Sequence, residues 1–148
     1  MTPEFTRALT FVLRWEGGWS DNAADPGGAT MKGITLATFT AWRAAQYQSA
    51  PTKADLKAIS DDEVTAIYWY WYWLKAGCDS LAWPLSLAHF DLAVNGGVGR
   101  AAEAMQAAPV FLRYMAWRIE WYTRLSTWAT FGAGWTRRCA DLLKEAAK

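Results

Sequence analysis

The sequence predicts a single domain of mainly α-helical class, with a small β-hairpin or long loop after its first helix. Apolar residues recur at intervals of three and four along most of the chain, which is the spacing of one helix face. No stretch shows the alternation typical of a larger sheet. Residues 19–33 depart from the helical pattern, because their glycine, asparagine, aspartate and proline residues indicate turns. A length of 148 residues fits one compact core.

The first helix is expected to begin at Thr2-Pro3-Glu4 and to end at Gly17. Thr2 supplies a capping hydroxyl, Pro3 suits the first turn, and Glu4 lies near the positive end of the helix dipole. The helix has an apolar stripe, and the next position on that stripe is Glu16. The stripe consists of Phe5, Leu9, Val12 and Leu13.

Further helices complete the predicted architecture. Ser60 and Glu63 form an S-x-x-E capping box that opens a strong helix. Residues 68–73 of that helix are all aromatic, so some rings must point away from the core. The helices are expected over residues 36–48, 53–59, 61–74, 85–95, 99–107, 110–125 and about 135–147.

The helix expected over residues 110–125 is amphipathic, and we expect its apolar face to pack on the core. A nucleic-acid-binding function is disfavoured, because the arginines of the basic C-terminal part do not share one helix face. The apolar face would hold Phe111, Met115, Ile119 and Tyr122, with Arg113, Arg118 and Arg124 largely off it.

The composition is that of a globular protein with an unusual number of tryptophans. Hydrophobic residues make up 53% and charged residues 20%, which excludes a disordered chain. The 11 Trp residues could form an aromatic core, or they could bind flat apolar surfaces such as sugar rings. The net charge of +1 combines −3 over residues 1–99 with +4 over residues 100–148. This basic end could attract an anionic polymer or be only solvated surface.

Cysteine and histidine usage excludes several chemistries. Cys78 and Cys139 cannot form a disulfide framework, and a single histidine, His89, leaves no Cys/His zinc cluster. We therefore expect no metal and no cofactor. His89 falls in a helical pattern and is expected to be a core residue. The N-terminus lacks the apolar segment of a secretory signal, which predicts synthesis and initial retention in the cytoplasm.

Glu16 is the candidate catalytic residue. It combines an apolar helix face with the negative end of the helix dipole, and both favour a protonated carboxylic acid. Such a group can protonate a leaving glycosidic oxygen. The structural alternative is a glutamate in a salt bridge with Arg14 or Lys32.

The glycine-rich segment after Glu16 adds further candidates. Asp25 follows Glu16 by nine residues, and hydroxyl groups follow at Thr30 and Thr35. Two carboxyl groups, one donating a proton and the other stabilising positive charge or activating water, are the parts of a sugar-cleaving site. Asp25 precedes Pro26 and could equally be a turn residue.

Three segments resemble the motifs of glycoside hydrolase family 108, the N-acetylmuramidases of phage endolysins and bacterial lysis or secretion factors. Residues 16–35 are similar to the signature E-G-G-aromatic, D-P-G-G-x-T-x-x-G-I-T. Residues 67–81 are similar to I-Y, Y-W, C-D-x-L, and residues 90–101 to F-D-x-A-V-N-x-G, G-R-A. A segment D-G-x-I-G-P-x-T expected after residue 106 is absent.

The resemblance implies a lysozyme-like fold and a specific activity. The implied enzyme cuts the β-1,4 bond between N-acetylmuramic acid and N-acetylglucosamine in peptidoglycan, with Glu16 as the catalytic acid and Asp25 and Thr30 at motif positions. It implies a catalytic region over residues 1–106 and a shortened peptidoglycan-binding region over residues 107–148, packed as one monomeric unit. A holin or other membrane-permeabilising partner would release the enzyme from the host cytoplasm to the cell wall.

We also expect a glycan groove lined by aromatic and polar side chains. Tyr68 and Trp71 share a stripe with Val64 and Ile67, so they are predicted to be core residues. The function that competes with the muramidase is that of a cell-wall-binding module with weak catalysis. The residues expected to bind glycan are Trp19, Thr35, Tyr70, Tyr72, Trp73 and Asn95.

Overall fold

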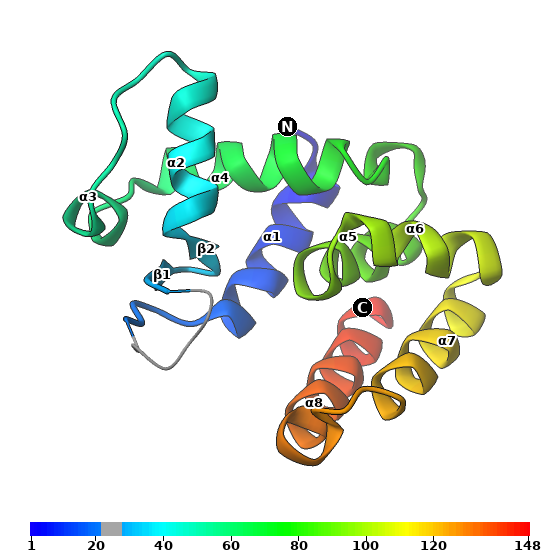
Figure 1. The fold of residues 1–148 in the computed structure, drawn as a ribbon. Coiled ribbons are helices and arrows are strands. Elements are labelled where there is room, and N and C mark those ends of the chain that lie inside the picture. Colours follow the sequence, from blue (N-terminus) through cyan, green and yellow to red (C-terminus); the bar gives the residue numbers. More distant parts are fainter. Residues whose placement is uncertain (22–27) are drawn as a thin grey trace. The chain divides into compact units, whose positions relative to one another are not determined.

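The computed structural model describes residues 1–21 and 28–148 and divides the chain into two compact units (Figure 1). One unit combines residues 1–11 with residues 69–148, and the other consists of residues 12–68. Helix α1 (Pro3–Glu16) contributes to both units. Its start agrees with the sequence prediction, since the hydroxyl of Thr2 accepts a hydrogen bond from the backbone N–H of Phe5 at 3.2 Å. Gly17, with φ of 69°, follows its last residue.

The unit of residues 12–68 is built around a short hairpin and three helices. Strands β1 (Thr30–Met31) and β2 (Ile34–Thr35) pair antiparallel, with Thr30 opposite Thr35. The two turn residues, Lys32 and Gly33, both have positive φ, as the tight turn of a two-residue hairpin requires. Helices α2 (Leu36–Ala45), α3 (Lys53–Lys57) and α4 (Asp61–Tyr68) follow. The buried side chains of this unit include Val12, Ile34, Phe39, Leu56, Val64 and Ile67.

The predicted capping box at the start of α4 is present. The backbone N–H of Glu63 donates to the Ser60 hydroxyl at 3.2 Å, and the Glu63 carboxylate accepts from the backbone N–H of Ser60 at 3.5 Å. These reciprocal bonds satisfy two N–H groups at the start of the helix that have no partner within it.

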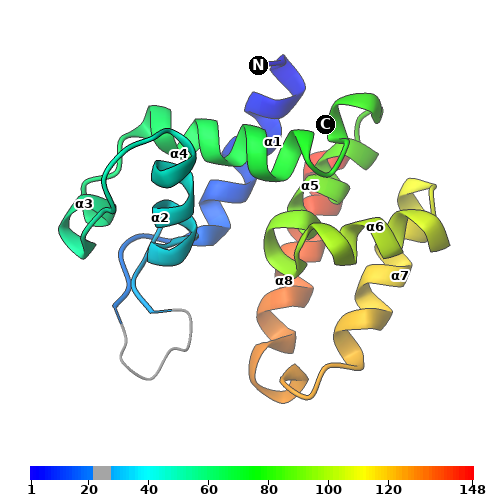
Figure 2. The same cartoon turned by 45° about the horizontal axis from the view of Figure 1, so that its top comes forward.

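The other unit is centred on helix α5 (Leu85–Gly96), which is buried along most of its length. It packs against the π-helix η1 (Trp69–Leu74), the short 3₁₀ helix η2 (Cys78–Ser80), and the three following helices. Figures 1 and 2 show the last two helices lying side by side and running in opposite directions. These helices are α6 (Val98–Ala107), α7 (Phe111–Thr123) and α8 (Trp128–Ala146). The C-terminal helices therefore share one compact unit with α5 and α6.

The predicted fold class is confirmed: the described residues are mainly helical, with a small two-stranded hairpin after the first helix. The last helix is longer than expected, because it begins at Trp128 rather than near residue 135. Gly132 lies inside it, where the ring of Trp128 packs so closely that an added methyl group would meet it at 2.6 Å. The glycine is required by packing and does not end the helix.

The aromatic segment 68–73 changes its helical period, which corrects the prediction for Trp73. An α-helical stripe through Ile67 and Tyr68 would next bury Trp71, but the chain enters a π-helix at residue 69. The wider turn shifts the buried face by about one residue per turn. Trp73, five residues after Tyr68, is consequently only 1% exposed, whereas Trp71 is half-buried. Trp73 is thus a core residue and not part of an open groove.

A buried ion cluster joins α5, α7 and α8. The carboxylate of Asp91 accepts from Arg118 Nη2 at 2.6 Å and lies 2.9 Å from Arg138 Nη2. Burial by itself would raise the pKa of Asp91, but the two guanidinium groups outweigh it and hold that pKa below its usual value. The expectation that Arg118 lies off the buried face of α7 is wrong, since Arg118 is fully buried. Its pairing with Asp91 stabilises a charge that sequence periodicity places outside the core.

The single histidine and both cysteines are buried. His89 is buried, as predicted, and its Nε2 donates to the carbonyl of Ala76 at 2.9 Å, so its Nδ1 accepts from the Tyr114 hydroxyl at 3.0 Å. Cys78 and Cys139 are both free and buried, and burial raises the pKa of each thiol.

No helix among the described residues combines the length and apolar character needed to cross a membrane.

Candidate active site

The last residue of α1, Glu16, lies against the turn of the β-hairpin. A methyl group added at Gly33 would lie 2.7 Å from Oε2 of Glu16 and 2.6 Å from the hydroxyl oxygen of Tyr68. The Glu16 carboxylate and the Tyr68 hydroxyl therefore both contact the same face of the turn. All three residues belong to the unit of residues 12–68, so the relationship is internal to that unit.

The hairpin turn is held in place by Tyr68. Its hydroxyl donates a hydrogen bond to the carbonyl of Lys32 at 2.8 Å, while its ring is buried in the core. A buried tyrosine normally uses its hydroxyl in this way, as an anchor for a polar group at the edge of a core. Tyr68 thus connects α4 to the turn beside Glu16. Sequence analysis placed Tyr68 in the core correctly but contained no signal for this hydrogen bond.

The chain that follows α1 is also joined to the hairpin. Ser20 and Thr30 exchange two backbone hydrogen bonds, at 2.8 and 2.9 Å. The backbone N–H of Leu36 donates to the carbonyl of Ala29 at 2.9 Å. Ser20 and Ala29, on either side of the undescribed residues, are therefore both bonded to the hairpin or to the chain that directly follows it. Asp25, the predicted second carboxylate, lies outside the described residues.

The two predicted threonines occupy opposite positions on the hairpin, and both hydroxyls have partners. The Thr30 hydroxyl donates to the carbonyl of Gly28 at 3.2 Å. The Thr35 hydroxyl accepts from the backbone N–H of Thr38 at 3.1 Å and caps α2. Both residues are half-buried.

The charged side chains around the hairpin form pairs. Lys32 pairs with Asp61 at 2.5 Å, which places its ammonium group with the start of α4. The ammonium group of Lys57 lies 5.7 Å from the centroid of the Trp19 ring. Trp19 itself is half-buried and follows the two glycines after Glu16. It therefore offers a partly open ring near the end of α1, with a cation on one side.

The remaining predicted glycan-binding residues belong to the other unit and are described within it. Tyr70 is 54% exposed and Tyr72 is half-buried. Trp73 packs edge-on against Phe5 and Phe90, with ring centroids 5.5 and 5.4 Å apart.

Asn95, the last of these predicted residues, is exposed at the end of α5. Its side-chain oxygen accepts a hydrogen bond from the Tyr122 hydroxyl at 2.5 Å. The same hydroxyl accepts from Arg118, so Asn95 is linked to the buried ion cluster. The interaction that the structure describes for Asn95 is therefore internal.

The chemistry available beside Gly33 is that of a positioned carboxyl group. Glu16 can donate or accept a proton, and the tyrosine and the turn fix where it lies. Among the described residues, no three His, Cys, Asp or Glu side chains come together in a way that could hold a metal ion.

Comparison with known proteins identifies the family of the chain. The family model named glycosyl hydrolase 108 matches residues 9–97, more than half of the chain. Among solved structures, the chain is similar to that of Brucella abortus SagA, with 31% sequence identity and a TM-score of 0.83. That match covers 97% of this chain and 94% of the other. No curated protein matches the sequence.

The family match includes Glu16 and the hairpin. The chain belongs to glycosyl hydrolase family 108.

Proposed function

We propose that the protein is a muramidase that hydrolyses the β-1,4 bond between N-acetylmuramic acid and N-acetylglucosamine in peptidoglycan. Membership of the family supports a lysozyme-like peptidoglycan hydrolase. The observation that carries the proposal is the position of Glu16, whose carboxylate lies against Gly33 and next to the Tyr68 hydroxyl. Glu16 acts as the general acid that protonates the leaving glycosidic oxygen.

The proposed second component of the reaction is Asp25, with Thr30 beside it in sequence. A glycosidase needs a second group that stabilises the oxocarbenium-like transition state or activates water. The hydrogen bonds of Ser20, Thr30 and Leu36 fix both ends of the segment that carries Asp25. Asp25→Asn should reduce turnover per folded molecule. A lowered melting temperature with unchanged turnover would assign Asp25 to the turn alone.

Glycan binding is proposed for the exposed or half-exposed members of the predicted set. Flat aromatic faces pack against pyranose rings, and threonine and asparagine side chains bond to sugar hydroxyl and acetamido groups. Trp19 supports this role by its partly open ring after the Glu16-Gly-Gly motif. The proposed residues are Trp19, Thr35, Tyr70, Tyr72 and Asn95; Trp73 is omitted because it is buried.

In the cell, we assign the protein the role of an endolysin. It would be held in the host cytoplasm until a holin or similar partner permeabilises the membrane, and would then act as a monomer on the cell wall. Residues 1–106 would supply catalysis and residues 107–148 a shortened wall-binding region. The net charge of +4 over residues 100–148 supports attraction to anionic wall polymers, and added salt should weaken that attraction.

The bond that is cut can be identified from the new reducing ends. Purified peptidoglycan is digested, reduced with borohydride and analysed by mass spectrometry after acid hydrolysis. A muramidase produces muramitol, whereas glucosaminitol would contradict the proposed specificity. The same digestion is carried out with Glu16→Gln, which should release no new reducing ends. Asp62→Asn serves as its control, because Asp62 is an exposed carboxylate of the same unit. Sedimentation of the protein with cell walls without new reducing ends would instead support the wall-binding alternative.

A further inference from the structure

The buried ion cluster of α5 and α7 continues to the protein surface through a second pair of side chains. Asp91 and Asn95 lie one turn apart on α5, and Arg118 and Tyr122 lie one turn apart on α7. Arg118 Nη2 donates to Asp91 at 2.6 Å, and the Tyr122 hydroxyl donates to Oδ1 of Asn95 at 2.5 Å. Asp91 is fully buried, whereas Asn95 is exposed. A chain of hydrogen bonds therefore leads from the buried carboxylate to an exposed amide.

The direction of the outer hydrogen bond is determined by Arg118. A guanidinium group only donates, and both Nε and Nη2 of Arg118 bond to the Tyr122 hydroxyl oxygen, at 3.0 and 2.8 Å. Burial raises the pKa of that hydroxyl, although Arg118 opposes the shift, so Tyr122 keeps its proton. The proton is donated to Asn95, which must accept it with its amide oxygen. The nitrogen of Asn95 cannot occupy this position, because it is only a donor.

The amide nitrogen of Asn95 consequently points away from Tyr122. Oxygen and nitrogen lie on opposite sides of a planar carboxamide group, so a bond that fixes the oxygen also fixes the nitrogen. The two N–H bonds of this nitrogen have no acceptor among residues 1–21 and 28–148. Asn95 thus presents an oriented hydrogen-bond donor at an exposed position.

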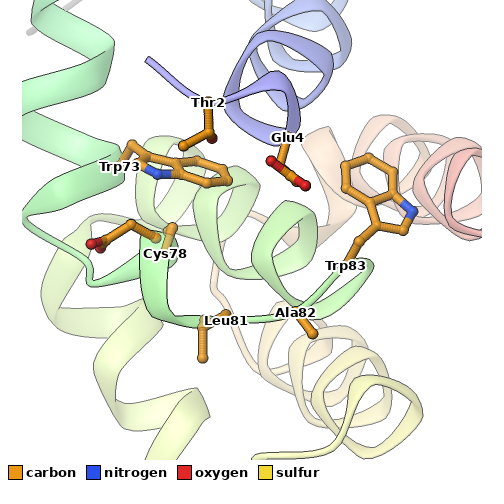
Figure 3. Close-up of a pocket in the computed structure, with 8 residues that line it drawn as sticks. Thr2, Glu4, Trp73, Cys78, Leu81, Ala82 and Trp83 are labelled. Atoms are coloured by element: carbon orange, nitrogen blue, oxygen red, sulfur yellow. The ribbon is translucent and has the colours of Figure 1, made fainter.

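A hollow in the same unit shows why the exposure of this donor matters. The hollow, of about 210 Å³, lies at the start of α1 and is lined by Trp73 and Cys78 (Figure 3). Figure 3 shows the indole nitrogen of Trp73 on the edge of the ring that faces Cys78, and both residues are almost completely buried. A ligand in that hollow cannot reach the nitrogen. The amide of Asn95, in contrast, is accessible from solvent.

An aromatic ring lies beside the exposed amide. A methyl group added at Gly96, the residue after Asn95, would lie 3.0 Å from Cη2 of Trp121. The Trp121 ring is half-buried, and its centroid lies 5.0 Å from that of Tyr122. The end of α5 therefore combines an oriented N–H donor with a partly open indole ring. We call this combination of Asn95 and Trp121 the amide site.

We propose that the amide site binds the acetamido group of an N-acetylated sugar, and that Arg118 and Tyr122 position Asn95 for it. The acetamido carbonyl oxygen only accepts hydrogen bonds, so it matches the outward N–H groups of Asn95. The face of the sugar ring packs against Trp121. An ammonium group in place of the acetamido group only donates, so it finds no acceptor on this side of Asn95. Asn95 is then a residue that determines specificity.

Recognition of acetamido groups by Asn95 rests on the proposed function, since both sugars of the peptidoglycan glycan strand carry such a group. Binding at the amide site does not involve the proton of Glu16, so binding and cleavage can be measured separately. Release of muramitol without ligand contact at Asn95 would overturn this inference alone. Contact at Asn95 without release of muramitol would contradict only the proposed muramidase.

The test is a titration followed by ¹H–¹⁵N NMR of the side-chain amide groups. Asn95→Asp assigns the Asn95 signals, because that variant keeps an oxygen for the Tyr122 hydroxyl and removes the N–H groups. Tri-N-acetylchitotriose is the probe. Chitotriose, which carries amino groups in place of the acetamido groups, is the matched control ligand. We expect only the acetylated trimer to shift the Asn95 signals saturably, with a dissociation constant on the order of 1 mM.

A donor-to-acceptor exchange at Asn95 measures the specificity. Asn95→Asp should weaken binding of the acetylated trimer by roughly tenfold, because it removes the donor, and should strengthen binding of chitotriose, whose ammonium groups donate. Gln106→Glu makes the same change from amide to carboxylate at an exposed position on α6 of the same unit, and should alter neither affinity. Melting temperatures confirm that both variants are folded.

Two further variants test the positioning of the amide. Tyr122→Phe releases the Asn95 oxygen and should reduce the preference for the acetylated trimer by roughly threefold or more. Arg118→Lys keeps a positive charge beside Asp91 but lacks the fork that also binds Tyr122, so it should reduce the same preference. A folded variant of either kind that keeps the full preference overturns the positioning role.

The proposal as a whole is overturned if the Asn95 signals do not move when the acetylated trimer is added. An unchanged preference between the two trimers in Asn95→Asp also overturns it, as does an equal loss of binding in Gln106→Glu.

Discussion

Gly33 lies so close to Glu16 that a single methyl group on its Cα would sit 2.7 Å from the Glu16 carboxylate oxygen Oε2. The hairpin turn and the end of α1 are thus in direct contact, and the turn leaves no room for a side chain. Gly33 also has φ of 76°, a conformation that disfavours residues other than glycine. One residue therefore serves both the turn and the position of the carboxylate.

Gly33→Ala should impair activity more than backbone strain alone can explain. Gly28 is the matched control, because it has φ of 67° in the same unit but nothing within 4 Å of an added methyl group. Both variants should lose about 1 kcal/mol of folding free energy from the strained φ. Only Gly33→Ala should also displace Glu16 and lower hydrolysis per folded molecule, by roughly tenfold or more. Equal activities of the two variants would argue against this positioning.

Glu16→Gln should remove hydrolysis and preserve the fold. The substitution keeps the shape of the side chain and takes away the proton that it donates, so the rate should fall on the order of 10²-fold or more. Initial rates of reducing-end release measure the effect, with melting temperature as the check on folding and Asp62→Asn as the control. Activity within about tenfold of the wild type would remove Glu16 from the catalytic role.

The aromatic segment should separate into core and surface residues as the π-helix dictates. Trp73→Ala should destabilise the protein by about 3–5 kcal/mol, because it empties a packed position between Phe5 and Phe90. Tyr70→Ala should change stability by less than about 0.5 kcal/mol, since Tyr70 is 54% exposed. Urea denaturation measures both. Weaker glycan binding by folded Tyr70→Ala would support its proposed groove role.

Asp91→Asn should be strongly destabilising. The change leaves the guanidinium groups of Arg118 and Arg138 in the core without their counter-charge, which in comparable buried pairs costs about 3–5 kcal/mol. Asp141→Asn is the control, because the Asp141 pair with Lys144 is solvent-exposed and should contribute at most about 1 kcal/mol. Similar denaturation midpoints for the two variants would show that the cluster contributes little to stability.

The stability of the protein should decrease as the pH falls below about 6.5, partly through His89. Burial holds the pKa of His89 below its ordinary value, so the folded state favours the neutral ring while the unfolded chain takes up a proton. The stabilisation is complete above the unfolded pKa and is lost as the pH falls toward the folded pKa. His89→Gln should flatten this part of the profile between pH 7 and pH 5. A wild-type profile retained in full by the variant would assign the dependence to other groups.

Local chemistry made much of the fold predictable from the sequence. The hydroxyl of Thr2, the Ser60–Glu63 box and the stop at Gly17 act through neighbouring backbone groups, so the bounds of α1 and the start of α4 follow from adjacent residues. The candidate carboxyl group was found for the same reason, because a position at the end of an amphipathic helix is visible in the spacing alone.

Other features were decided only by tertiary structure, because their causes lie far away in the chain. Arg118 is buried because Asp91, 27 residues earlier, provides its counter-charge.

The register of Trp73 depends on the widened π-helical turn, and its packing against Phe5 and Phe90 occurs between segments that no periodicity connects. The contact of Gly33 with Glu16 was likewise decided by tertiary structure. Residue spacing identifies a carboxyl group and a turn, but it does not give the distance between them. The sequence by itself determined most of the helices, through interactions within one or two turns, and it indicated a candidate carboxyl group. Only long-range packing, which depends on the shapes of side chains brought together from distant segments, decided which rings and charges are buried and where the carboxylate is held.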